Sequence, residues 1–227
     1  MQKEYTIKEK LEKKVNGVYN RITKRSLDLF FSLILLIFIL PVYLVIITIQ
    51  LIVSGKPIFY TPLRAGFNDK AFKIIKFRTM VRNADKIGGG TTALNDIRIT
   101  KFGKFLRKTK LDEIPQLINI IIGNMSFIGP RPELLKYTDK YSELEQYILK
   151  VRPGITDYSS IKFINLDEIV GDTNADDVYE QKILTIKNNL RLEYVLKFSF
   201  FVDLRIFFVT LKKVAIKAIR GGYNGKN

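Results

Sequence analysis

The dominant feature of the hydrophobic pattern is one long apolar segment near the N-terminus. Residues 27–53 read LDLFFSLILLIFILPVYLVIITIQLIV, with no formal charge from Leu29 to Ile49. This is about the length that a helix needs to cross the apolar core of a bilayer, and a buried soluble helix is rarely apolar on every face. Many charged and polar residues precede it and no small-residue cleavage site follows, so the pattern is not that of a signal peptide. We expect this segment to enter the membrane.

A proline near the middle leaves the path of this segment open. Pro41 removes a backbone hydrogen bond and crowds the preceding turn, which bends a helix. Basic residues flank both ends: Arg21, Lys24 and Arg25 before it, and Lys56 and Arg64 after it. The positive-inside rule therefore assigns no orientation. The residues alone fit a kinked transmembrane helix and equally a helix that returns to the face from which it entered.

A second apolar segment near the C-terminus is mixed with basic residues. Residues 198–217 read FSFFVDLRIFFVTLKKVAIK. This composition is typical of a helix that lies among lipid headgroups, with its rings buried and its lysines reaching outward. A helix that packs into the protein core is the alternative.

The remaining pattern predicts a mostly helical domain with a small β element. AFKIIKFRTM (71–80) alternates apolar and basic side chains, as a short strand or extended segment does. Helical patterns occupy part of 97–111, about 112–122, about 133–150 and 175–196, and Gly123 is a suitable stop for the second of these. The polar residues 1–20 carry Ile7, Leu11 and Val15 at a spacing of four, which fits a modest amphipathic helix or a frayed tail.

Two loops stand out. KIGGGTTALND (86–96) is glycine-rich, but no Gly-Lys-Ser/Thr follows, so it is not a P-loop. In GPRP (129–132) two prolines bracket Arg131 and force an extended, rigid turn.

Composition narrows the chemistry. The 227 residues include neither cysteine nor histidine, so disulfides, thiolate metal sites and histidine bases are excluded. Acid–base or nucleophilic work would fall to Asp, Glu, Lys or Tyr. The net charge of +16 suits a polyanionic partner, which could be nucleic acid, an anionic lipid surface or a phosphorylated small molecule.

The most informative short stretch is RKTKLDEIPQLI (107–118), which holds two adjacent carboxylates. In one interpretation Asp112 caps a helix, with Glu113 in the first turn and Pro115 close behind. A cap needs one acid, however, and constrained arginines surround the pair: Arg78 in KFRTM, Arg107 in FLRKT and Arg131 in GPRP. Arginine grips phosphate oxygens with two donors. The alternative is therefore a site for a phosphorylated substrate, with Mg²⁺ bridging carboxylate and phosphates.

Several stretches resemble a known family. KRSLDLFFSLILLIFILPVYLVI, FKIIKFRTM, ITKFGKFLRKTKLDEIPQLINIIIGNMSFIGPRPEL and VRPGIT are similar to the bacterial sugar transferases, the monotopic polyprenyl-phosphate phosphoglycosyl transferases. The resemblance covers roughly residues 22–215, and the length resembles that of the small members of the family.

The resemblance implies a reaction. A nucleotide diphosphate sugar, by family habit a UDP-sugar, gives its phosphosugar to polyprenyl (undecaprenyl) phosphate, and UMP leaves. On this basis Asp112 is the nucleophile that forms a covalent phosphosugar intermediate, and Glu113 assists and helps to hold Mg²⁺. The basic positions of the family fall on Arg78, Arg107 and Arg131.

The resemblance also implies an architecture and a location. We expect an α+β protein with a polar tail (1–20), a re-entrant membrane helix (21–55) broken at Pro41, a mostly helical cytosolic catalytic domain with interfacial amphipathic helices (56–220), and a C-terminal tail (221–227). The active site would face the cytoplasm at the bacterial inner membrane. Expected partners are the two substrates, membrane lipid and downstream glycosyltransferases, and no nucleic acid. The product would begin a capsule, O-antigen, exopolysaccharide or glycoprotein glycan.

The chain has Leu40-Pro41 where the family has a Ser-Pro pair, and it departs from the family pattern in two further places. After VRPGIT it continues with DYSSIKF (157–163) where many members have Gly-Trp, and ILTIK (183–187) lacks the usual Leu-Pro before the lysine. Both departures bear on substrate choice. The competing hypothesis is a catalytically inactive, membrane-anchored basic binding or scaffold protein. It accounts for the charge and the anchor, but not for the acid pair or the Pro-Arg-Pro turn.

Overall fold

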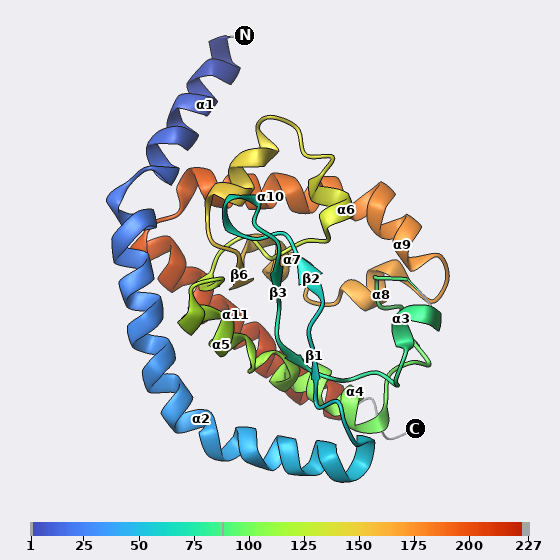
Figure 1. The fold of residues 1–227 in the computed structure, drawn as a ribbon. Coiled ribbons are helices and arrows are strands. Elements are labelled where there is room, and N and C mark those ends of the chain that lie inside the picture. The colour runs from blue at the N-terminus through green and yellow to red at the C-terminus, as the bar shows by residue number, and fades with distance from the viewer. Residues whose placement is uncertain (1, 88, 224–227) are drawn as a thin grey trace.

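The computed structural model describes residues 2–87 and 89–223 of the chain (Figure 1). The N-terminal polar segment forms helix α1 (Gln2–Val15), followed by a short π-helical turn (Tyr19–Thr23). Leu11 and Val15 are buried against helix α10 (Leu184–Lys197), and Lys14 Nζ donates to the Phe198 carbonyl, 3.1 Å away. The first residues therefore form a helix that packs on the domain.

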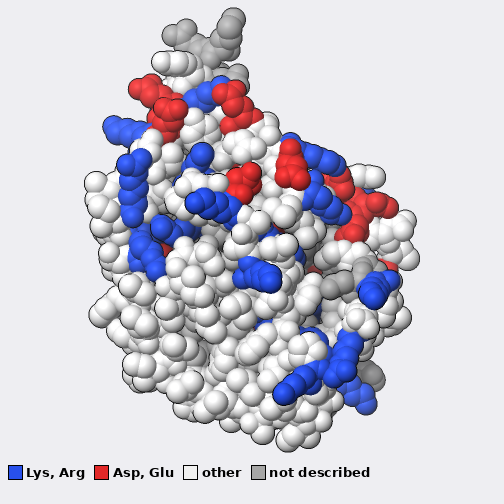
Figure 2. All heavy atoms as spheres, in the orientation of Figure 1, with Lys and Arg blue, Asp and Glu red and all other residues white. Residues whose placement is uncertain are grey.

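The long apolar segment is one continuous helix, α2 (Lys24–Ser54), with Pro41 inside it. In Figure 1 α2 runs down one side of the domain and then turns along its base. Helix 19–54 is long and apolar enough to cross a membrane, and only 11% of its most apolar window is buried in the protein. The lower left edge of the space-filling view, where α2 runs, is without charged side chains (Figure 2).

Both ends of α2 are fastened to the same domain. At the start, Lys24 forms a buried ion pair with Asp203 of helix α11 (Phe200–Tyr223). At the end, Gln50 Nε2 donates to the Arg78 carbonyl at 2.8 Å, and Ile46 is buried. The residues between them expose large apolar side chains, among them Leu33, Ile34, Leu35, Ile37, Phe38, Leu40, Val42, Leu44 and Val45. Helix α2 thus presents most of its middle outward, while Ile39 and Tyr43 on its inner side pack against the domain.

Within residues 2–87 and 89–223, the strands form three two-stranded sheets. β1 (Phe59–Tyr60) pairs antiparallel with β4 (Lys76–Phe77), and β2 (Leu63–Arg64) with β3 (Phe72–Lys73). β5 (Ser126–Ile128) and β6 (Gly154–Thr156) pair in parallel. The mostly helical fold with small sheets is compatible with the expected α+β class, and the extended segment expected at 71–80 contains β3 and β4.

The remaining helices are short. They are η2 (Phe67–Asp69), α3 (Ala84–Ile87), α4 (Lys101–Thr109), η3 (Leu111–Glu113), α5 (Gln116–Ile122), α6 (Leu135–Thr138), η4 (Glu145–Lys150), α7 (Tyr158–Lys162), α8 (Leu166–Val170), α9 (Ala175–Val178) and η5 (Tyr179–Ile183). The helix expected over 133–150 is therefore two separate turns, α6 and η4.

Capping by Asp112 is wrong. Helix α4 ends at Lys110, whose left-handed backbone (φ 59°) turns the chain into the 3₁₀ turn η3. Pro115 then stands at the start of α5, where its missing N–H costs no helical hydrogen bond. Gly123, with φ 100°, ends α5 as expected, because glycine adopts this conformation without strain. Asp112 thus lies in a buried 3₁₀ turn rather than at a helix end.

Apolar contacts fix that turn against helix α2. Leu111 and Ile114, which flank the acid pair, pack on a cluster that contains Ile46 of α2, Phe77 and Leu106. Ile114 also packs on a second cluster, to which α2 contributes Ile39. The turn that carries the acid pair therefore lies directly beside α2.

Helix α11 is amphipathic, as its sequence suggests. Asp203 and Ile206 are buried against the domain. The opposite face exposes Phe200, Phe201, Leu204, Phe207, Phe208 and Leu211. An apolar outer face of this kind suits a lipid headgroup region.

Candidate active site

The acid pair sits in the 3₁₀ turn η3 between α4 and α5. Asp112 is 7% exposed and Glu113 is 8% exposed. Two neighbouring carboxylates at this depth need positive charge nearby, because an isolated buried charge is very costly. The cations come from two distant segments.

Glu113 takes both of these cations. Lys76 of β4 places Nζ 3.1 Å from Glu113 Oε1. Arg131 grips the same carboxylate with both terminal nitrogens, Nη1 lying 3.2 Å from Oε2 and Nη2 bonding Oε1. Burial alone would raise the pKa of Glu113, but Arg131 first and Lys76 next outweigh it and hold the pKa well below its usual range. Glu113 is thus ionised, and the charges of Arg131 and Lys76 balance its negative charge.

Asp112 lacks a comparable partner. Its Oδ1 is buried and finds no hydrogen-bond donor among the residues that the structure describes. Burial, and after it the negative charge of Glu113, raises the pKa of Asp112, while Lys76, Lys110 and Arg107 oppose the rise. An ionised carboxylate oxygen with no donor attached is a ready nucleophile. The two acids therefore differ in their surroundings: Glu113 receives the cations and Asp112 Oδ1 receives no donor.

The Pro-Arg-Pro turn holds Arg131 in place. Arg131 Nη1 donates to the Ile155 carbonyl at 2.6 Å, and its backbone N–H donates to Asp157 Oδ2 at 3.1 Å. The turn and β6 lie so close that a Cβ on Gly154 would come within 2.1 Å of the Gly129 nitrogen. Only glycine fits at this contact, and it locks the turn to β6.

Arg107 projects from α4 towards the same region. Its Nε donates to Thr79 Oγ1 at 2.8 Å and its Nη1 to Thr92 Oγ1 at 2.9 Å. Burial lowers the pKa of Arg107, and Asp112 is the strongest opposing influence. Arg107 therefore lies within electrostatic range of Asp112 while its hydrogen bonds go to neutral hydroxyls.

Arg78 is placed differently. Its Nη2 donates to the carbonyls of Ser54 and Gly55, at 2.6 and 2.8 Å, where α2 ends. Burial, and then the like charge of Arg82, lowers the pKa of Arg78. The structure thus brings Arg131 onto the dyad and Arg107 near it, and places the Arg78 guanidinium at the end of α2. The phosphate-binding roles of all three stay predictions.

Two residues of the site were missing from the sequence interpretation. Lys76 had a signal, because it lies two positions before Arg78 in the alternating segment 71–80 and so on the same side of an extended chain. Asp157 had none, since its contact with Arg131 joins segments that are 26 residues apart.

A second buried polar cluster lies behind the Pro-Arg-Pro turn. Glu133 pairs with Arg191 at 2.9 Å and accepts from the Tyr179 hydroxyl, to which Lys187 donates at 3.0 Å. Burial opposes ionisation of Glu133, but Arg191 and Lys187 bring its pKa down to about 2. Burial, and then Arg191, lowers the pKa of Lys187 to about 8.

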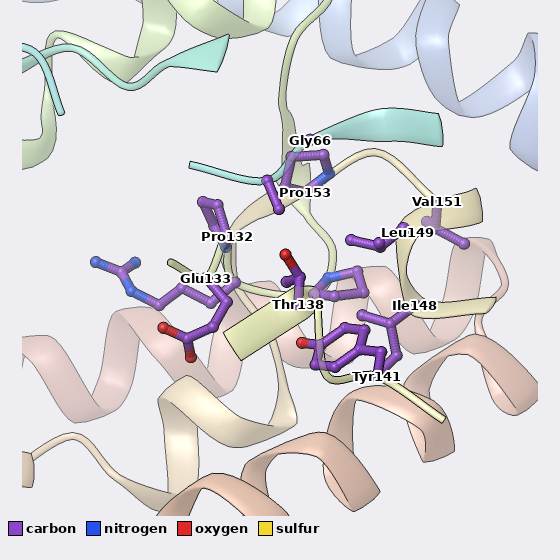
Figure 3. Close-up of a pocket in the computed structure, with 12 residues that line it drawn as sticks. Gly66, Pro132, Glu133, Thr138, Tyr141, Ile148, Leu149, Val151 and Pro153 are labelled. Atoms are coloured by element: carbon purple, nitrogen blue, oxygen red, sulfur yellow. The ribbon is translucent and has the colours of Figure 1, made fainter. Parts of the chain in front are cut away.

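The cavity beside this cluster is too small for a substrate. Its volume is about 10 Å³, room for roughly one water molecule. Figure 3 shows Tyr141, Ile148 and Leu149 closing one side of it, with Gly66 and Pro153 on the other. These residues pack the back of the turn that carries Arg131.

The oxygens of the dyad are of the kind that magnesium binds. No group of three or more acidic, His or Cys residues that could hold a metal ion occurs in the described part of the chain. Mg²⁺ is commonly held by one or two carboxylates, with phosphate oxygens of the substrate and water as its other ligands. Asp112 and Glu113 offer such oxygens, and Asp112 Oδ1 has no donor attached. Magnesium binding at the dyad stays a prediction, in which a phosphorylated substrate and water would supply the other ligands.

Comparison with known proteins identifies the class. The family model of the bacterial sugar transferases matches residues 19–217, so the chain belongs to this family.

Three curated relatives show the range of that similarity. The UDP-glucose:undecaprenyl-phosphate glucose-1-phosphate transferase of Klebsiella pneumoniae is 39% identical over 204 residues, which cover 88% of this chain and 41% of that protein. The UDP-N-acetylgalactosamine-undecaprenyl-phosphate N-acetylgalactosaminephosphotransferase of Aeromonas hydrophila is 31% identical, covering 84% and 43%. The uncharacterized sugar transferase EpsL of Bacillus subtilis (strain 168) is 34% identical, covering 86% and 88%. The chain thus spans about two fifths of the length of the first two.

The division of charge predicts that Asp112→Asn raises the thermal midpoint at neutral pH. Because the pKa of Asp112 is raised in the folded protein, its ionisation destabilises the fold. Removing that charge should add on the order of 1 kcal/mol, about 2–4 °C for a chain of this size. The gain in the free energy of unfolding should be complete at pH values above the raised pKa of Asp112. It should vanish as the pH falls below 3.8, the ordinary pKa of an aspartate. Thermal unfolding across pH measures it.

Glu113→Gln is the matched comparison and should act in the opposite direction. It leaves Arg131 and Lys76 without their counter-charge, which typically costs about 3–5 kcal/mol. Since the pKa of Glu113 is lowered in the folded protein, its stabilisation is present above the ordinary value of 4.5 and is lost as the pH falls through the folded value. Shifts of the same sign for both substitutions would contradict the assigned charges.

Proposed function

We propose that the protein transfers a phosphosugar from a nucleotide diphosphate sugar, a UDP-sugar, to polyprenyl (undecaprenyl) phosphate. The observation that carries the proposal is the divided acid pair: Glu113 is neutralised by Arg131 and Lys76, while Asp112 Oδ1 has no donor attached. In this arrangement the Asp112 carboxylate is free to attack, and the Glu113 carboxylate binds the two cations. The names of the relatives in Klebsiella and Aeromonas describe the same kind of reaction.

In the proposed mechanism Asp112 attacks the phosphorus that bears the sugar. The new bond joins the carboxylate oxygen to phosphorus, the bond to the bridging oxygen breaks, and UMP leaves with that oxygen. An oxygen of polyprenyl phosphate then attacks the same phosphorus and displaces Asp112. The product is a polyprenyl-diphosphate sugar, and the carboxylate is regenerated.

Besides the nucleophile, the protein supplies electrostatic stabilisation in both steps. Charge spreads over the phosphoryl oxygens in the transition state, and preorganised cations stabilise it. Arg131 and Lys76 lie at the dyad, and Arg107 stands within electrostatic range of Asp112. Magnesium, held by Glu113 and phosphate oxygens of the substrate, would offset further negative charge when bound.

The nature of the sugar stays open within the proposal. One relative is named for glucose and another for N-acetylgalactosamine, although both share the matched region with this chain. The proposed product would begin a surface polysaccharide or another glycoconjugate, and glycosyltransferases that extend a lipid-linked sugar would use it next.

We further propose that α2 enters and leaves the membrane on one face, the cytoplasmic face of the inner membrane. Lys24 and Gln50 lie near opposite ends of α2 and both contact the same domain. A helix spanning the bilayer would carry these two residues to opposite sides, so the contacts favour the re-entrant path. The bend near Pro41 and the exposed apolar middle of α2 also support it.

A catalytically inactive scaffold is the competing function. Such a protein would gain nothing from burying Asp112 without a donor, because an unpaired buried carboxylate lowers stability. In an enzyme, this loss of stability leaves the Asp112 carboxylate free to react.

The reaction itself is tested by release of UMP from UDP-sugars in purified membranes or nanodiscs. The proposal expects release that requires polyprenyl phosphate for turnover and magnesium for full rate, with one of a panel of sugars preferred. Asp112→Asn should fold and lose turnover by at least about a thousandfold, because an amide is no nucleophile at phosphorus. Absence of transfer with every sugar tested, or Asp112→Asn retaining the parent rate, would favour the scaffold.

Arg131→Ala should reduce kcat/KM by about tenfold to a hundredfold, because a buried charge-assisted contact to the dyad and the phosphates is lost. The matched control is Lys140→Ala. Lys140 pairs with Glu180 at 3.0 Å on the surface, its side chain is 70% exposed, and such pairs contribute little. Its kcat/KM should stay within about twofold of the parent. Equal effects of the two substitutions would place Arg131 outside the reaction.

The membrane path is tested with single cysteines on either side of α2, since the chain has none of its own. Lys10 precedes α2, Lys70 follows it, and both are exposed. Lys10→Cys and Lys70→Cys should both resist an impermeant thiol reagent in intact cells and react after lysis. Reaction of one position alone in intact cells would show that α2 spans the membrane.

A further inference from the structure

Asp157 is a fully buried carboxylate in the stretch where this chain departs from the family pattern. It follows β6, precedes α7, and is 0% exposed. Its two oxygens serve different segments. Oδ1 accepts from the Ser160 N–H at 2.7 Å and caps α7, while Oδ2 accepts from the Arg131 N–H at 3.1 Å. The Ser159 and Ser160 hydroxyls also donate to it.

The Arg131 N–H has a particular place in its turn. Pro130 and Pro132 carry no N–H, so Arg131 is the one backbone donor of the three residues. A donor buried without an acceptor is costly, and an ionised carboxylate is a strong acceptor. Asp157 therefore accepts the hydrogen bond of the Arg131 N–H, and this bond ties the Pro-Arg-Pro turn to the segment after β6.

Asp157 also sits among cations. Burial opposes the charged form of Arg131, but Glu113 first, and then Asp157, outweigh burial and raise the pKa of Arg131. Asp157 likewise favours the charged forms of Lys187 and Arg191, whose pKa values are governed first by burial. Asp157 thus influences cations of both the dyad and the buried cluster of Glu133.

The segment that carries Asp157 is fastened to α11. Thr156 Oγ1 lies 2.9 Å from Thr210 Oγ1, and Lys213 Nζ donates to the Ile161 carbonyl at 2.9 Å. Asp157 is therefore held from one side by the helix with the apolar outer face, and it holds Arg131 on the other.

We propose that Asp157 is a positioning residue for the transfer reaction: it receives the Arg131 N–H and thereby keeps the Arg131 guanidinium on Glu113. The consequence for the reaction rests on the proposed function. The contact itself does not, and can be tested without activity.

Hydrogen exchange tests the contact. Within 129–132 the exchangeable backbone hydrogens are those of Gly129 and Arg131, and Gly129 N–H is bonded to the Thr156 carbonyl at 3.0 Å. Asp157→Asn replaces one acceptor oxygen by an NH₂, which cannot accept from either of the two backbone donors, the Arg131 and Ser160 N–H groups, and Asp157→Gly offers no side-chain acceptor. In Asp157→Gly the Arg131 amide should exchange about tenfold to a hundredfold faster. Ser160→Ala, which removes a hydroxyl but leaves the Arg131 contact, should exchange as the parent does.

A double-mutant cycle tests the effect on the reaction. If Asp157 acts through Arg131, Asp157→Gly should lower kcat/KM by about tenfold or more in the parent and by less than about twofold in the Arg131→Ala background. A general loss of stability would lower kcat/KM by the same factor in the parent and in the Arg131→Ala background. Asp157→Asn should fall between Asp157→Gly and the parent, and Ser160→Ala should match the parent.

The outcomes separate the two proposals. Parent-like exchange of Arg131 in Asp157→Gly would overturn the positioning role whether or not the protein is a transferase. Equal losses in both backgrounds of the cycle would overturn it as well. A parent that releases no UMP while the Arg131 amide is deprotected in Asp157→Gly would overturn the proposed function and leave the contact established.

Discussion

Two adjacent carboxylates in one buried turn repel each other and lose hydration, so the turn is stable only if cations reach it. Here Lys76 arrives from β4 and Arg131 from the turn after β5, and both contact Glu113. Asp112 is left with a raised pKa and an oxygen without a donor. The close contact between Gly129 and Gly154 holds the turn that carries Arg131, and Asp157 accepts from the Arg131 N–H. Both contacts keep Arg131 beside Glu113.

The second constraint is the distance between this turn and the membrane helix. Leu111 and Ile114, on either side of the dyad, pack on the cluster that holds Ile46 of α2. A phosphate on a lipid chain stays at the headgroup level, whereas a nucleotide sugar comes from water. Under the proposed function, a carboxylate in a turn that packs on α2 can meet both substrates. The exposed apolar face of α11 fits the same orientation.

The sequence allowed the dyad, Arg131 and Pro41 to be singled out because each stands in a short, constrained frame whose chemistry is local. The expected helix cap at Asp112 failed because the left-handed Lys110 and Pro115 together impose a 3₁₀ turn. Lys76 and Asp157 were missed since their importance lies in contacts between distant segments. The position of Arg78 at the end of α2 depends on how α2 bends, which local pattern does not determine.

The central claim, that the unpartnered Asp112 carboxylate is the nucleophile, is tested most directly by intact mass measurement of the protein incubated with its UDP-sugar and magnesium, without polyprenyl phosphate. The account predicts a mass increase of one phosphosugar, located on the peptide that contains Asp112, and its loss when polyprenyl phosphate is added. Turnover that proceeds with polyprenyl phosphate while the protein never gains this mass would mean direct transfer between the substrates and would contradict the account.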